Sequence, residues 1–92
     1  MKTHELKLNN EFADAVLCGE KNFEIRENDR GFQKGDHVVF HVINPKATFG
    51  SFYVDHPLND KEFEIVYVIN GWGLKNGYVV FSIREVINAL PY

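Results

Sequence analysis

The stretch KNFEIR, which begins at Lys21, carries an ammonium, a carboxylate and a guanidinium group within six residues. Phe23 and Ile25 alternate with polar residues, which predicts a strand whose two apolar side chains face the core. Glu24 and Arg26 would then leave the opposite face about 6–7 Å apart. Lys21 has the other parity, unless a bend in the preceding residues turns it toward this pair.

Two interpretations of these charged residues are open. A solvated strand face is common, and an exposed ion pair contributes about 0–1 kcal/mol. A ligand cleft would instead use the carboxylate to accept from an N–H group on a base edge. The lysine and the arginine would donate to phosphate or carbonyl oxygens, the arginine through its planar fork.

The remaining reactive residue types predict no metal site and no cofactor. His37 and His41 would stand about 13 Å apart on a strand, too far for one ion. Cys18, the single cysteine, follows a predicted helix, where the helix dipole does not activate a thiol. Ser51 and Ser82 lack the flanking glycines of a nucleophile elbow.

Several aromatic residues lie in segments that are predicted to be turns and loops. Trp72 stands between two glycines, Tyr78 follows the same turn, and Phe49, Phe52 and Tyr53 lie in a long connection. Such rings can stack on bases, at about 1–3 kcal/mol for each base. They can equally close the open ends of a small barrel.

Length and charge limit the class of protein. The 92 residues predict a single domain over residues 1–92. No signal peptide and no run of about 18 apolar residues is present, so we expect a cytoplasmic protein without a membrane partner. Because the net charge is −3, we expect that any nucleic-acid binding depends on a local pocket and not on electrostatic attraction by the whole protein. No feature of the sequence sets an oligomeric state.

Hydrophobic periodicity predicts a mainly β chain with one early helix. A helix of about ten residues should follow the first strand, capped by Asn9 or Asn10 and ended by Gly19. We expect a small β-barrel of five or six strands. The expected strands are 3–8, 21–26, 37–43, 62–69 and 78–83, with a short one at 51–54 in the 44–60 connection; residues 84–92 would add a helical turn or cross the barrel end.

The segment HELKLNNEFADAVLCGEKNFEIRENDRGFQKGDHVVF resembles the ASCH family of the PUA-like superfamily. It is closest to the small bacterial and phage branch known as DUF3850. The resemblance rests on GEKNFEIR as the family's G-x-K-x-x-E-x-R, on DRGFQKGD as a turn, and on GYVVFSI near the end. It implies a PUA-like β-barrel with a cleft that binds RNA or modified nucleosides.

The resemblance also implies that Lys21, Glu24 and Arg26 of the motif line the cleft. We predict that an RNA or a nucleotide-like small molecule is bound by Lys21, Glu24, Arg26, Arg30, Trp72 and Tyr78. Some ASCH relatives are amidohydrolases that use a lysine, a threonine three residues later and a distant glutamate. Here Lys21 matches, but Glu24 stands in place of the threonine, and the short NGWGLKNG turn leaves no room for the distant glutamate.

Two functions therefore follow from the sequence. The first is an RNA- or nucleotide-binding module. The alternative is a hydrolase acting on a modified nucleoside or on single-stranded RNA, with Lys21 and Glu24 as the catalytic pair. An accessory protein that binds another protein through the aromatic loop is the residual possibility.

Overall fold

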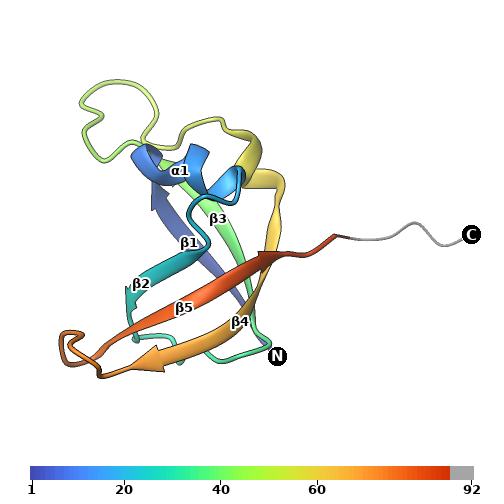
Figure 1. Cartoon of the computed structure of the whole chain (residues 1–92). Helices are drawn as coiled ribbons and strands as arrows, with labels where there is room; N and C mark the ends of the chain where they lie inside the picture. The colour runs from blue at the N-terminus through green and yellow to red at the C-terminus, as the bar shows by residue number, and fades with distance from the viewer. Residues whose placement is uncertain (88–92) are drawn as a thin grey trace, which may run out of the picture.

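The computed structural model describes residues 1–87 and shows five strands, one α-helix and one short 3-10 helix (Figure 1). The prediction of a mainly β chain with one helix after the first strand is confirmed. The elements are β1 (Thr3–Asn9), α1 (Asn10–Leu17), β2 (Phe23–Glu27), β3 (His37–Ile43), η1 (Pro57–Asp60), β4 (Glu62–Asn70) and β5 (Tyr78–Glu85).

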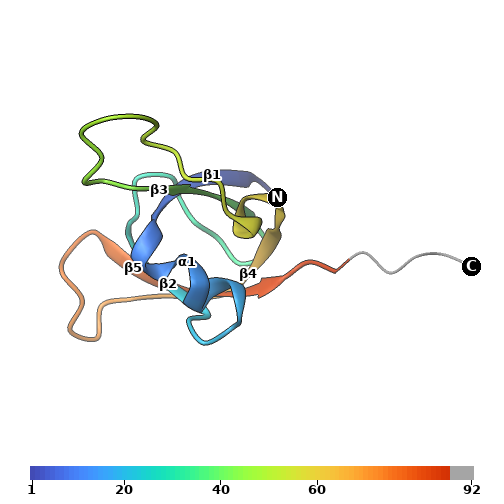
Figure 2. The same ribbon diagram turned by 90° about the horizontal axis from the view of Figure 1, so that it is seen from above.

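The strands form one mixed sheet in the order β1-β3-β4-β5-β2. β1 pairs with β3 in parallel, and the other neighbours are antiparallel. The sheet curls, so that β1 and β3 lie across from β2, β4 and β5 (Figure 2). Its edge strands β1 and β2 are not paired with each other, and the expected closed barrel is therefore not formed.

Helix α1 begins and ends where local chemistry predicts. Asn9 is the N-cap, and its side-chain oxygen accepts from the backbone N–H of Glu11 at 3.1 Å. Gly19 follows the helix with a φ of +84°, a conformation that glycine adopts without strain. Ala13 and Val16 are buried against the core, so the helix covers one end of the curled sheet.

The apolar core is contributed by α1, η1, the turn before β3 and every strand except β2. β3 alternates cleanly, with Val38, Phe40 and Val42 buried. The other buried apolar side chains are Leu6, Leu8, Ala13, Val16, Phe32, Leu58, Phe63, Ile65, Val79, Phe81 and Ile83.

Strand β2 reverses the predicted assignment of its faces. Glu24 is 3% exposed, whereas Phe23 and Ile25 are 40% and 55% exposed. The pairing register explains this, because Glu24 lies opposite the buried Phe81 of β5. Residues directly opposite in an antiparallel pair share a face, so Glu24 must point inward. The expectation that Phe23 and Ile25 face the core is wrong.

Strand β4 changes the side of its alternation part-way along. Phe63, Ile65, Tyr67 and Ile69 have the same parity in the sequence, so a regular strand would place all four on one face. A register shift between Ile65 and Tyr67 leaves the intervening residue without a partner on β5. A bulge of this kind flips the alternation, so Tyr67 and Ile69 lie on the outer face, where they are 63% and 38% exposed.

The connection from β3 to β4 is anchored at two points. The predicted strand at 51–54 is reduced to a single bridge between Ile43 and Tyr53. Leu58 of η1 is fully buried, and Asn59 accepts from the N–H of Val42 at 2.9 Å.

Part of the segment predicted at 84–92 continues β5 to Glu85, and residues 88–92 lie outside the described residues. No helix within residues 1–87 is long and apolar enough to span a membrane.

A buried polar pair joins β1 to the turn before β3. The ring of His4 lies 2.8 Å from a carboxylate oxygen of Asp36, and both residues are 5% exposed. Asp36 also accepts from the backbone N–H groups of Lys2 and Gln33. Burial alone would raise the pKa of Asp36, but these hydrogen bonds outweigh it, and the pKa lies below its ordinary value.

We predict that Asp36 stabilises the fold above about pH 4 and that this contribution disappears as the pH falls. The folded pKa is below the unfolded value of about 3.9, so acid favours the unfolded chain. Urea unfolding of Asp36→Asn at neutral pH should show a loss of about 1–3 kcal/mol. The difference from the unmodified protein should shrink below pH 4. The exposed Asp55→Asn is the control, and a difference that does not vary with pH would contradict the prediction.

Candidate functional site

The candidate site is centred on the carboxylate of Glu24, which is bonded by two cations. Lys21 Nζ donates to Oε2. Arg26 donates to Oε1 from both Nε and Nη2, at 2.9 and 2.7 Å. The Glu24 side chain is 4% exposed, against 19% for Lys21 and 25% for Arg26. The structure thus excludes the solvated-face interpretation for Glu24.

The chain between α1 and β2 turns Lys21 toward Glu24. After Gly19 the backbone N–H of Lys21 donates to the carbonyl of Ala15 at 3.0 Å, and the ammonium group donates to the carbonyl of Phe23 at 2.9 Å. The bend places Lys21 on the side of Glu24 despite its opposite parity. From the sequence, Lys21 could face Glu24 and Arg26 only if a bend preceded the strand, and the structure has such a bend.

Two arginines, Arg26 on β2 and Arg30 in the connection after it, donate to the unpaired edge of β1. Arg26 Nη2 donates to the carbonyl of Lys7, and Arg30 Nη1 donates to the carbonyl of Glu5, each at 2.9 Å. These carbonyls are two residues apart on β1 and face the same way, as alternate carbonyls of a strand do. The guanidinium groups thus donate hydrogen bonds to backbone carbonyls at the edge of β1, which would otherwise be open to pairing with another strand.

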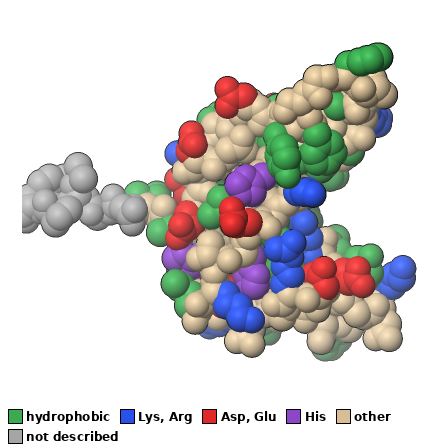
Figure 3. All heavy atoms as spheres, turned by 180° about the vertical axis from the view of Figure 1, so that it is seen from behind, with side chains coloured by type: hydrophobic (Ala, Val, Ile, Leu, Met, Phe, Trp, Pro, Cys, Tyr) green, Lys and Arg blue, Asp and Glu red, His purple; other side chains and the backbone are tan. Residues whose placement is uncertain are grey.

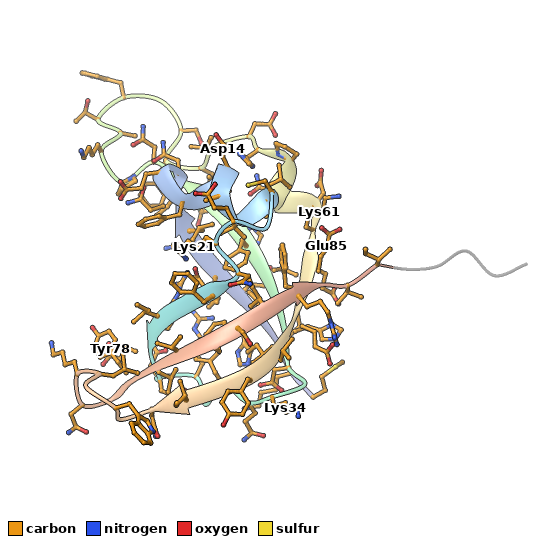
Figure 4. All side chains as sticks on the ribbon, viewed as in Figure 1. Asp14, Lys21, Lys34, Lys61, Tyr78 and Glu85 are labelled. Carbon is orange, nitrogen blue, oxygen red and sulfur yellow. The ribbon has the colours of Figure 1, made fainter. Side chains whose placement is uncertain are left out.

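A pocket of about 430 Å³ lies over the cation–carboxylate cluster. Phe12 and Phe23 form walls beside Lys21, with the ammonium nitrogen 5.2 and 5.0 Å from their ring centroids. Figure 4 shows Lys21 between α1 and the start of β2. The pocket thus combines exposed aromatic surface with cationic donors. It is lined by Lys7, Leu8, Asn9, Phe12, Lys21, Phe23, Glu24, Ile25 and Arg26.

A second pocket of about 740 Å³ adjoins the first, because Lys7 and Arg26 line both. Arg30 lies in this second pocket. Figure 3 shows Lys and Arg side chains gathered at an indentation of the surface, next to hydrophobic side chains. The residues that line the second pocket are Glu5, Lys7, Arg26, Arg30, His41 and Tyr53.

The structure does not bring the other two predicted ligand residues to this place. Trp72 is 92% exposed in the turn between β4 and β5, and it lines neither pocket. Tyr78 lines a separate pocket beside Lys75, at the end of the sheet away from Lys21 (Figure 4). Trp72 lies within the glycine-rich turn and Tyr78 directly after it, so both stand at the start of β5.

Phe12, Phe23 and Lys7 are among the lining residues that were not predicted as site residues. Phe23 was expected to face the core, but Phe12 and Phe23 are 41% and 40% exposed. Lys7 was expected on a strand but was not connected with the motif. One signal that could have found the two rings is that an aromatic residue precedes Lys21 in the chain and another follows it.

Each of the four histidines pairs with a carboxylate, and no group of three or more potential metal ligands occurs among residues 1–87. His41 lies 3.0 Å from Glu5, and His56 lies 2.8 Å from Asp14. The other two pairs are His4 with Asp36 and His37 with Glu62. These pairs join different elements, so the histidines have structural partners in the described part of the chain.

Comparison with known proteins identifies the family. The family model described as "Domain of unknown function (DUF3850)" matches residues 3–83. The chain belongs to this family. A segment of 40 residues is 42% identical to the "Uncharacterized 12.9 kDa protein in GpA 3'region" of Escherichia phage P2. The match spans 44% of this chain and 37% of the phage protein.

One solved structure supports the fold. The crystal structure of hypothetical protein PH0355 matches with a TM-score of 0.57, over 94% of this chain and all of that one. The two sequences are 16% identical, so the similarity concerns the fold alone.

We predict that Glu24→Gln destabilises the fold by about 3 kcal/mol, because it leaves two cations beside a neutral amide in a buried position. Thermal or urea unfolding measures the effect. Glu27→Gln is the matched control, since Glu27 is exposed at the end of the same strand and should change stability by less than about 0.5 kcal/mol. Equal effects of the two substitutions would show that Glu24 is not held as a buried ion.

Proposed function

We propose that this DUF3850 protein binds a nucleotide or an unpaired base of single-stranded RNA in the pocket over Glu24. The observation that carries the proposal is the pair of exposed rings, Phe12 and Phe23, whose centroids lie 5.2 and 5.0 Å from the Lys21 ammonium nitrogen. Aromatic rings stack on any base, and cationic donors beside them can bind the oxygens at its edge.

Lys21 and Arg26 have N–H groups that remain available to donate hydrogen bonds to a ligand. An ammonium group has three N–H donors, and Lys21 uses two of them on Phe23 and Glu24. Arg26 uses Nε and Nη2 within the protein, which leaves its two Nη1 donors without an acceptor among the described residues. Glu24 was expected to accept from a base edge. Both of its oxygens are bonded to cations, and we now assign it the role of holding them in place.

The overall charge of −3 supports weak binding that depends on the pocket, with a shallow dependence on salt. We further propose that the curled sheet is the ASCH/PUA-like fold, on the strength of the G-x-K-x-x-E-x-R motif around Lys21. The proposed location is the cytoplasm, where the exposed thiol of Cys18 would stay reduced.

The hydrolase alternative has less support from the geometry. Lys21 and Glu24 are already bonded to each other, and the residues lining the pocket include no Ser, Thr, Cys or His. We expect no turnover of acylated cytidine or single-stranded RNA above that of a Lys21→Ala/Glu24→Ala double variant. Product formation that needs both residues would overturn this ranking.

We predict that Phe12→Ala weakens binding of a labelled, short single-stranded RNA by about 5- to 150-fold, the range expected for the loss of one stacking contact. Fluorescence anisotropy measures the affinity. Phe12 is 41% exposed, so truncation should leave the fold intact.

Trp72→Ala is the matched control for that experiment, because Trp72 is a more exposed ring outside both pockets. Its affinity should equal that of the unmodified protein. A loss on Trp72→Ala with none on Phe12→Ala would move the binding site to the turn between β4 and β5. Equal affinity of Lys21→Ala and the unmodified protein would remove the proposed role of Lys21.

A further inference from the structure

The second pocket has a composition that base stacking does not explain. Of the residues that line it, Lys7, Arg26 and Arg30 are cationic and only Glu5 is anionic. The whole chain, by contrast, has a net charge of −3. A concentration of positive charge in an acidic protein points to an anionic group on the ligand.

We infer that the second pocket is a phosphate subsite, and that the ligand is therefore a nucleotide carrying a phosphate on its sugar and not a free base or a nucleoside. The inference rests on the proposed function, because it takes the first pocket as the place of the base.

The two arginines are held in position before any ligand arrives. Their carbonyl partners, on Lys7 and Glu5, are two residues apart on β1, so the two carbonyl oxygens that hold the guanidinium groups are about 7 Å apart. One phosphate group between the guanidinium groups can accept from both. The hydrogen bonds to β1 fix the side chains, which reduces the entropy lost when an anion binds.

Both arginines keep donors for this purpose. Arg26 has its two Nη1 N–H groups, and Arg30 uses one Nη1 donor on Glu5, which leaves its other N–H groups. Guanidinium forks match the geometry of phosphate oxygens and bind them in pairs. Lys7 adds a mobile ammonium group at the shared wall, 5.8 Å from the ring of Phe52.

The position of the second pocket fits a single ligand that spans both. Lys7 and Arg26 line the two pockets in common, so a base against Phe12 and Phe23 has its sugar directed past Arg26. Glu5 opposes an anion, but its carboxylate is 3.0 Å from the ring of His41, and three cations outnumber it. Tyr53, which is 54% exposed, supplies further contact surface on the outer wall.

The test compares ligands that differ only in the phosphate. Calorimetric titrations would use the four ribonucleosides, their 5′- and 3′-monophosphates, and inorganic phosphate alone. We expect at least one monophosphate to bind about tenfold or more tightly than its nucleoside, as charge-assisted hydrogen bonds to phosphate would give. Arg30 lines the second pocket and not the first, so Arg30→Gln should remove most of that advantage and leave nucleoside binding unchanged. Lys7 lines both pockets, so Lys7→Gln is read from the ratio of monophosphate to nucleoside affinity, which should fall toward one.

Two variants separate the loss of the phosphate subsite from a disturbed fold and from a general change in charge. Lys7 is exposed and donates no hydrogen bond in the described structure, so Lys7→Gln tests the subsite even if Arg30→Gln disturbs the sheet edge. Lys34→Gln removes an equal charge from an exposed position that lines neither pocket, and it should preserve the tenfold preference.

The outcomes separate the two proposals. Nucleosides and monophosphates that bind equally would overturn the phosphate subsite and leave the base pocket standing. Inorganic phosphate that binds through Lys7 and Arg30, without any nucleoside binding, would support the subsite and overturn the base pocket. Absence of binding by every probe would overturn both.

Discussion

Glu24 carries a carboxylate into the interior at the place where the sheet is open, and Lys21 and Arg26 compensate its charge. Burying an ion without partners costs on the order of several kcal/mol, so the carboxylate and its cations have to be in place together. Arg26 is also tied to the edge of β1 through Lys7. A single hydrogen-bonded group therefore fixes the end of α1, the start of β2 and the gap between the edge strands.

The same group shapes the candidate site. Since Glu24 uses both oxygens on cations, its role in the proposed site is to orient donors and not to contact a ligand. The donors that remain on Lys21 and Arg26 are adjacent to the aromatic walls of the first pocket, and Arg26 is shared with the second. Under the proposed function, structural stability and ligand binding depend on overlapping residues. This explains why a strand at the edge of a small domain carries three charged residues so close together.

Local signals in the sequence predicted much of the fold. The Asn9 cap and Gly19 bounded the helix, and alternation located the strands. The wrong assignments involved long-range structure. The inward face of β2 is set by its register with β5, and the outward turn of Tyr67 is set by a bulge that no pattern in β4 reveals. Barrel closure was overestimated because β1 and β2 are joined by the side chain of Arg26 and not by backbone pairing, with Arg30 reaching β1 from the connection after β2. In the candidate site, Lys21, Glu24 and Arg26 were predicted together and lie together, and Arg30 adjoins them. Trp72 and Tyr78 could not be placed from the sequence, because their position depends on which end of β5 faces the cleft.

The most direct measurement is a crystal structure of the protein soaked with a mixture of ribonucleoside monophosphates. We predict electron density for a base against Phe12 and Phe23, with its phosphate within hydrogen-bond distance of Arg26 and Arg30. Glu24 should still be buried between its cations. Density for the nucleotide beside Tyr78 instead, or a Glu24 side chain turned into solvent away from Lys21 and Arg26, would contradict this prediction.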